Sequence, residues 1–121
     1  MKNFLLVFLG GGLGSVSRYL ISSFMDSSQT GIPFGTLLSN VLGSFLVGII
    51  LGLSLKNNFL SQSAVLFLAT GFCGGFTTFS TFAYENHLFL KSGDFMSFAL
   101  YFLLSVVLGF ALVFIGIWLV K

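Results

Sequence analysis

Residues 71–82 read GFCGGFTTFSTF and lie within residues 57–84, which carry no charged side chain. A helix in lipid is usually built from Leu, Ile and Val. This stretch instead carries a glycine pair that favours unwinding, four hydroxyl side chains, and phenylalanines spaced at i, i+3 and i+6. Irregular backbone at membrane depth is tolerated only where protein or a water-filled path covers it, and broken helices often mark ion sites. The stretch therefore predicts a membrane helix interrupted near residues 74–78, at a site that handles an ion.

The composition places the rest of the chain in the membrane as well. Of the 121 residues, 56% are hydrophobic and only 7% are charged, far less charge than a soluble domain carries. A membrane-spanning helix needs about 20 mainly apolar residues. The charge-free runs predict an all-α integral membrane protein, a single four-span domain over residues 1–121, with spans near residues 3–25, 33–55, 61–89 and 95–120.

The segments between these spans have the residues typical of turns. Residues 26–31 form a polar turn, and Pro33 suits the start of a helix. The second span is expected to stop at Lys56-Asn57-Asn58, and residues 91–94 are expected to form a tight turn. No small-residue cleavage site follows Lys2, since the first alanine is Ala64. The N-terminal segment is therefore interpreted as a retained helix and not as a signal peptide.

The distribution of positive charge gives only a weak orientation signal. Four spans place Lys2, Lys56 and Lys121 on one side of the membrane, whereas Arg18 and Lys91 lie toward the other. Basic residues favour the cytoplasmic side. Two interpretations stay open at this point: the chain takes one orientation with a small bias, or it inserts both ways and pairs antiparallel.

Small residues recur four positions apart in three of the spans, a spacing that lets helix backbones approach closely in lipid. They are Gly10/Gly14 and Gly11/Ser15 in the first span, Gly35/Ser39/Gly43 and Ser44/Gly48/Gly52 in the second, and Ser105/Gly109 in the fourth. Two offset stripes on the second span predict that it has more than one close neighbour. Because four short helices enclose little on their own, an oligomer is expected.

Residues for catalysis are scarce. The carboxylates are Asp26, Glu85 and Asp94, the one histidine is His87, and the lone Cys73 cannot form an internal disulfide. No nucleophile–base pair and no metal-ligand spacing is present. A net charge of +2 offers no footprint for nucleic acid. The chain is therefore predicted not to be an enzyme.

Polar residues inside the spans carry the functional signal. Asn40 lies in the second span, the hydroxyls of residues 77–81 follow the break, and Tyr101 and Ser105 share a face of the fourth span. Asn40 alone could serve a helix–helix hydrogen bond. Hydroxyl and amide groups donate hydrogen bonds, the edge of an aromatic ring is positive, and Arg18 adds charge near one entrance. Together they favour a small anion, although hydroxyl oxygens also coordinate cations.

Three blocks of the sequence resemble the signature blocks of the Fluc (CrcB) fluoride channels, in the right order and spacing and over essentially the whole chain. They are residues 11–19 (GGLGSVSRY), 35–45 (GTLLSNVLGSF) and 71–82. The resemblance implies a passive fluoride channel that exports fluoride across the bacterial inner membrane and gives fluoride resistance. It also implies an antiparallel dual-topology dimer with two pores.

The resemblance also assigns residues. It implies that backbone carbonyls of Gly74 and Thr77 hold a structural Na+ at the two-fold axis of the dimer. The residues that match the pore are Asn40, Phe79, Phe82, Ser80, Thr81, Tyr101, Ser105 and Arg18. Glu85 matches a carboxylate near the pore mouth. Because one chain keeps Asn40 and both pore phenylalanines, a homodimer is favoured over a heterodimer with a paralogue, which stays open.

Two other functions are weighed against a fluoride channel. A proton-coupled exporter of the small multidrug type is also a short, four-span, dual-topology protein, but it needs a carboxylate in its first span. No acidic residue precedes Asp26 here. A membrane-embedded lipid kinase would need several carboxylates to hold Mg2+ and nucleotide, and the chain has three in all.

Overall fold

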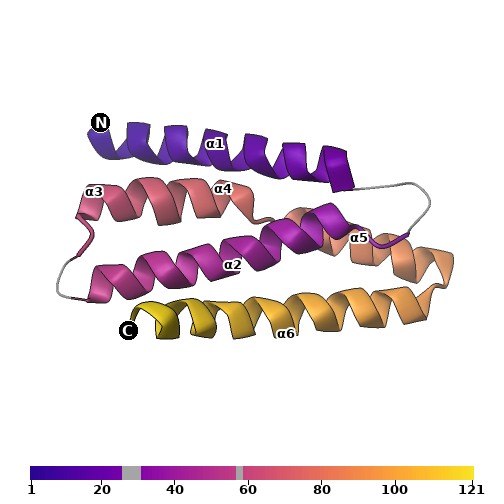
Figure 1. Ribbon diagram of the computed structural model, residues 1–121. Coiled ribbons are helices and arrows are strands. Elements are labelled where there is room, and N and C mark those ends of the chain that lie inside the picture. Colours follow the sequence, from indigo (N-terminus) through magenta and orange to yellow (C-terminus); the bar gives the residue numbers. More distant parts are fainter. Residues whose placement is uncertain (26–30, 57–58) are drawn as a thin grey trace.

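The computed structural model describes residues 1–25, 31–56 and 59–121, and every element in this part of the chain is helical (Figure 1). The elements are α1 (Lys2–Met25), α2 (Phe34–Leu55), α3 (Gln62–Val65), the π-helix η1 (Leu66–Cys73), α4 (Gly74–Phe76), α5 (Phe79–Ser92) and α6 (Phe95–Val120). In the described residues four helices are long and apolar enough to cross a membrane, with Gln62–Ser92 as the third. The prediction of an all-α protein with four spans is confirmed.

Capping residues at the helix ends explain several of these boundaries. Ser61 accepts a hydrogen bond from the Ala64 amide and so begins the third span. Asp94 does the same for α6 through the Ser97 amide. Hydrogen bonding from the Ser97 side chain, and then from its amide, lowers the pKa of the Asp94 carboxyl. Gly93, with φ +79°, ends α5 in a left-handed conformation.

The connection between α5 and α6 is shorter than predicted. The turn predicted for residues 91–94 is too long, because α5 continues through Ser92 and only Gly93 and Asp94 connect it to α6. The left-handed Gly93 lets its own amide and that of Asp94 bond back to the last helical turn, which makes the connection this short. The turn predicted at residues 26–31, apart from Gly31, and the stop at Asn57 and Asn58 lie outside the described residues.

Glycines set how closely the helices pack. A Cβ at Gly10 or Gly14 would overlap the backbone of η1, so α1 lies directly against the first half of the third span. A Cβ at Gly48 would overlap the Val113 carbonyl of α6, and one at Gly43 would overlap the Thr77 side chain. The second span thus has close neighbours on two sides, as its two small-residue stripes predict.

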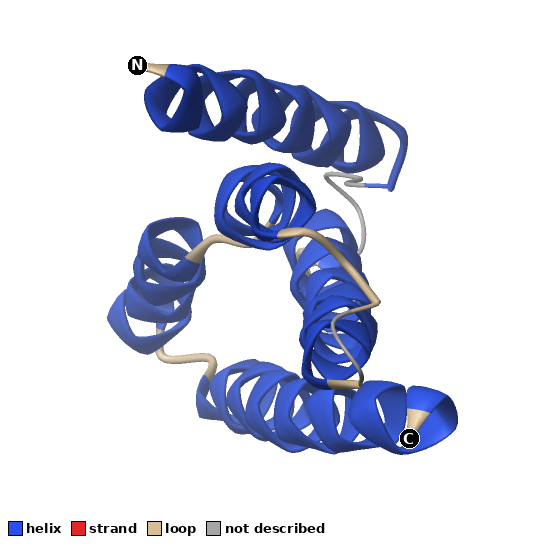
Figure 2. Cartoon of the chain, turned by 90° about the vertical axis from the view of Figure 1, so that its left-hand side faces the viewer, coloured by secondary structure: helices blue, strands red, loops and turns tan. Residues whose placement is uncertain are grey.

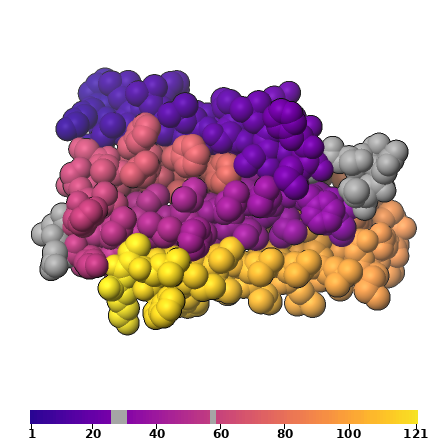
Figure 3. All heavy atoms as spheres, in the orientation of Figure 1, coloured from indigo at the N-terminus to yellow at the C-terminus, as the bar shows by residue number. Residues whose placement is uncertain are grey.

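The helices alternate in direction, so both termini lie at the same end of the bundle (Figure 1). α1 and α6 form its two outer edges, and their side chains cover much of the visible surface (Figure 3). Large apolar side chains on both helices are exposed, among them Phe8, Phe110, Phe114 and Trp118. A surface of this kind requires lipid or another protein around it, and the chain is a multi-pass membrane protein.

Candidate functional site

The third span is broken at two threonines. Thr77 has φ −88° and ψ 156°, and Thr78 has φ −150° and ψ 122°, both extended conformations. The chain therefore steps sideways, and α5 lies beside the axis of the first half instead of continuing it (Figure 2). The prediction of an interrupted third helix is confirmed.

The break lies within the predicted range 74–78, at Thr77 and Thr78, but the prediction that the glycine pair unwinds is wrong. Gly74 and Gly75 are both in α4, and Gly74 has the helical angles φ −62° and ψ −37°. A Cβ at Gly75 would overlap the Gly11 carbonyl of α1. Gly75 therefore serves the close approach of two helices, and the extended backbone begins only at Thr77.

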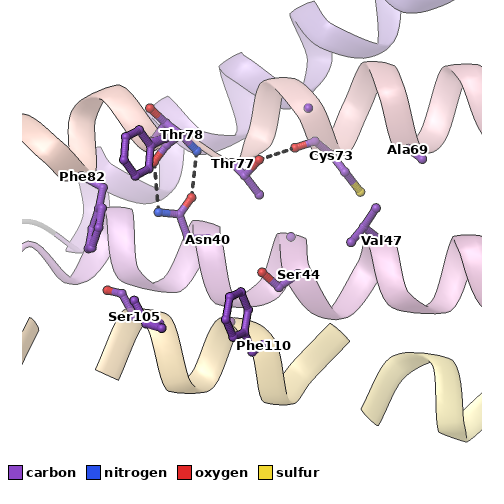
Figure 4. Close-up of a pocket in the computed structure, with 15 residues that line it drawn as sticks. Asn40, Ser44, Val47, Ala69, Cys73, Thr77, Thr78, Phe82, Ser105 and Phe110 are labelled. Atoms are coloured by element: carbon purple, nitrogen blue, oxygen red, sulfur yellow. Dashed lines mark hydrogen bonds between the residues drawn. The ribbon is translucent and has the colours of Figure 1, made fainter. Parts of the chain in front are cut away.

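Asn40 of α2 holds the broken segment through both ends of its amide (Figure 4). Its Nδ2 donates to the Thr78 carbonyl at 3.1 Å, and its Oδ1 accepts from the Thr78 amide at 2.8 Å. The side chain thus replaces the backbone hydrogen bonds that a continuous helix would give Thr78. A buried backbone needs such partners inside a membrane.

The threonine hydroxyls complete the two half-helices. Thr77 Oγ1 donates to the Cys73 carbonyl at 2.9 Å, at the end of the first half. Thr78 Oγ1 accepts from the Thr81 amide at 3.2 Å and so begins α5. The same hydroxyl lies 3.4 Å from Ser80 Oγ.

These bonds leave two backbone carbonyls without their ordinary helical donors. In an α-helix the carbonyl of residue i accepts from the amide of residue i+4. The Thr78 amide, the partner expected for Gly74, is bonded to Asn40. The Thr81 amide, the partner expected for Thr77, is bonded to the Thr78 hydroxyl.

The two carbonyls have the chemistry required by the cation site that the family resemblance implies. They are the carbonyls of Gly74 and Thr77, and Gly74 is also exposed on the surface of the protomer. Uncharged carbonyl oxygens are suitable ligands for a hard cation. The arrangement is compatible with a Na+ site completed by a second copy of the chain.

The next carbonyl of the break has side-chain donors from α1. Arg18 Nε donates to the Gly75 carbonyl at 3.3 Å, and Ser15 Oγ lies within 3.5 Å of the same oxygen. Arg18 is half-buried. The structure therefore places this predicted pore residue against the break, whereas its role toward an anion stays a prediction.

A cavity of about 550 Å3 lies between the break, α2 and α6 (Figure 4). It brings together six of the predicted site residues: Asn40, Gly74, Thr77, Phe79, Phe82 and Ser105. Three polar residues outside the predicted set also line it, namely Ser44, Cys73 and Thr78. Ser80, Thr81, Tyr101 and Arg18 are not among its lining residues.

One hydroxyl in the cavity is available to donate a hydrogen bond. Ser105 Oγ is buried and has no hydrogen-bond partner among the described residues. A buried hydroxyl without a partner is costly, so a ligand or water that accepts a hydrogen bond from it would stabilise the site.

The two predicted pore phenylalanines differ in exposure. The ring of Phe82 is 8% exposed and packs against Tyr101 with ring centroids 5.2 Å apart. The ring of Phe79 lies 6.1 Å from that of Phe82 and is 79% exposed. A ring so exposed beside the break is consistent with a site that one protomer does not close by itself.

Glu85 lies one turn beyond the cavity and joins three helices. Tyr101 of α6 donates to Glu85 Oε1 at 2.7 Å, and Thr36 of α2 donates to Oε2 at 2.9 Å. Tyr101 is fully buried and its hydroxyl is directed to this carboxylate. Thr36 was not predicted; its signal was a hydroxyl inside the second sequence block, on the face that carries Ser39, Asn40 and Gly43.

Comparison with known proteins places the chain in a family. The family described as "CrcB-like protein, Camphor Resistance (CrcB)" matches residues 5–117. A protein of Gloeothece citriformis named "Fluoride-specific ion channel FluC" is 49% identical, over 100% of this chain and 98% of its own length. Proteins of the same name from Chlorobaculum tepidum and Leptospira interrogans are 49% and 45% identical, over at least 99% of this chain and 95% of their own length.

These relatives are named as ion channels, so the expectation that the chain is not an enzyme is confirmed. The matched region contains all three sequence blocks, the broken third span and every predicted site residue. Because the family matches nearly the whole chain, including the break and the residues that line the cavity, the chain belongs to the CrcB family.

Proposed function

We propose that the chain is a passive, fluoride-selective channel. The observation that carries the proposal is the broken third span, with its cavity of hydroxyl, amide and aromatic groups, in a chain whose relatives are named fluoride-specific ion channels. Exported across the bacterial inner membrane, fluoride would no longer accumulate in the cell, and resistance to fluoride follows.

The chemistry of the cavity suits an anion without its water. None of the described residues that line it is a carboxylate. Ser105 supplies a hydroxyl without a partner. The Asn40 nitrogen carries two hydrogens, of which the Thr78 carbonyl takes one. The positive edge of the Phe82 ring adds a weaker attraction. These neutral groups replace water around fluoride without binding it as tightly as a buried cation would.

The proposed assembly is an antiparallel homodimer of dual topology with two pores. Exposed Phe79 and Gly74 border the cavity, so a second copy placed there would cover an apolar ring and bare backbone together. Phe79, Ser80, Thr81, Tyr101 and Arg18 would complete the paths in the dimer. Pairing with a paralogue would use the same surface.

The proposed cation site lies at the two-fold axis of that dimer. Carbonyls of Gly74 and Thr77 from both copies would supply four oxygens to one Na+. The ion would supply positive charge that holds the four carbonyls, and with them the two breaks, in place. The diversion of the Thr78 and Thr81 amides supports this proposal, because it leaves those carbonyls to another partner.

The test is anion efflux from liposomes that contain only this purified chain. Liposomes loaded with potassium fluoride should release fluoride when valinomycin lets K+ follow, and liposomes loaded with potassium chloride should release far less chloride. Protein-free liposomes give the background. Efflux no faster than that background would sink the proposal of a channel, and equal loss of both halides would sink its selectivity.

The exporter of the small multidrug type is not supported. Its coupling needs a carboxylate in the first span, and α1 contains no acidic residue. The chain also matches the CrcB family.

A further inference from the structure

Arg18 is the one charged side chain bonded to the break among the described residues, and its contact is specific. The guanidinium Nε donates to the Gly75 carbonyl, and the Ser15 hydroxyl approaches the same oxygen. In a continuous helix that carbonyl would accept from the amide of Phe79, but Phe79 begins the displaced helix α5. Arginine side chains commonly bond to the last carbonyls of a helix. Arg18 therefore caps the C-terminal end of a helix that stops inside the membrane.

Gly75 lies between Gly74 and the extended Thr77, so fixing its carbonyl also constrains the carbonyls on either side. Its own Cα has no freedom to shift toward α1, because even a Cβ would overlap Gly11 there. Asn40 holds the other side of the break from α2. The Gly74 and Thr77 carbonyls are thus held between one anchor on α1 and one on α2.

We propose that Arg18 is a positioning residue for the cation site: through its Nε–H bond to Gly75 it holds the broken backbone in the shape that binds Na+. This rests on the cation site of the proposed function. It differs from a role in attracting anions, because the required group is the donor at Nε and not the charge.

Three substitutions separate the donor from the charge. In Arg18→Gln the amide nitrogen takes the position of Nε along the side chain, so the donor is kept and the charge is lost. In Arg18→Lys a carbon takes that position, so the charge is kept and the donor is moved. Arg18→Met removes both. Lys2→Gln is the matched control, because it removes one positive charge from α1 far from the break.

The measurement is the Na+ concentration that gives half of the maximal rise in thermal unfolding temperature, in detergent, with choline holding ionic strength constant. Arg18→Gln and Lys2→Gln should match the unsubstituted chain. Arg18→Met and Arg18→Lys should need at least about tenfold more Na+, because the substitution removes one hydrogen bond from each of the two copies that share the site. Ser15→Ala should shift the value in the same direction by less, and it tests the same carbonyl if Arg18→Met does not fold.

The opposite pattern overturns the inference. In that pattern Arg18→Lys needs the same Na+ concentration as the unsubstituted chain, whereas Arg18→Gln needs as much as Arg18→Met. An unsubstituted chain that Na+ does not stabilise also overturns it, together with the cation site. Absence of fluoride efflux, with the Na+ dependence intact, would sink the conduction proposal alone and leave the role of Arg18 standing.

Discussion

At the scale of single residues, Asn40 makes the two hydrogen bonds that hold the backbone of the break. Its amide donates to one atom of Thr78 and accepts from another, so only a side chain with both functions fits. From the sequence, an asparagine in a span indicated either a helix–helix bond or a pore residue. The structure shows the bond and also places the side chain in the cavity wall, so the two interpretations do not exclude each other.

Asn40→Asp should abolish fluoride efflux. A carboxylate can still accept from the Thr78 amide, but it cannot donate to the Thr78 carbonyl, and it adds a negative charge to the path. Two like charges 4 Å apart repel by about 4 kcal/mol at an effective dielectric of 20, a factor on the order of a thousand in rate. Efflux assays with Asn3→Asp as the exposed control would check this, and unchanged efflux would remove Asn40 from the pore.

At the scale of the elements, Gly71 and Gly75 of the third span serve the close packing of helices and not flexibility. Gly75 and Gly12 make a matched pair, because both are in helices. A Cβ at Gly75 would overlap the Gly11 carbonyl, whereas a Cβ at Gly12 would meet nothing within 4 Å. The same substitution should therefore have opposite effects at the two positions.

Gly75→Ala should destabilise the chain by about 1–3 kcal/mol, the usual cost of overpacking. Gly12→Ala should leave stability unchanged or raise it by up to about 1 kcal/mol, since alanine favours a helix over glycine. Thermal unfolding in detergent compares the two proteins directly. Equal stability of the two variants would show that α1 and α4 do not pack as closely as described.

The sequence predicted the elements well and their details less well. The four spans and the existence of the break follow from charge-free runs and from hydroxyls where lipid-facing residues are expected. The residues that unwind within the predicted range 74–78 did not follow, because glycine favours both unwinding and close packing, and at Gly75 only the neighbouring Gly11 decides between them. The π-helix at Leu66–Cys73, which packs against α1, had no signal in the sequence.

The candidate site was predictable in part for a similar reason. Residue type and family blocks indicated Asn40, Phe82 and Ser105, which do line one cavity. Partners across helices did not follow from the sequence, because residues far apart in the chain meet only when α1 packs against α4 and α2 packs against α5. Thr36 with Glu85, and Ser15 with Gly75, are such pairs.

At the scale of the whole molecule, the question is orientation in the membrane. Lys2, Lys56 and Lys121 belong to one end of the bundle, Lys91 belongs to the other, and Arg18 lies part-way along α1 at the level of the break. Positive charge sets the orientation of short membrane proteins, and here the difference between the two sides is only a few charges. An antiparallel dimer needs copies inserted both ways, which so small a difference permits.

Single cysteines at opposite ends of the bundle would measure this. Asn3→Cys and Ser92→Cys are exposed positions that leave all lysines in place, while the native Cys73 is buried and shielded from the reagent. With a maleimide that does not cross membranes, about half of each variant should be labelled from outside the cell. Complete labelling of one and none of the other would show a single orientation and contradict dual topology.

The break also has an electrostatic consequence. Peptide dipoles add along a helix and leave a partial negative charge where it ends and a partial positive charge where it begins. The first half of the third span ends at Phe76, and α5 begins three residues later. One interrupted helix therefore presents both polarities at the same depth, the negative end suited to a cation and the positive end to an anion, so the backbone itself attracts ions of either sign in a chain with only 7% charged residues.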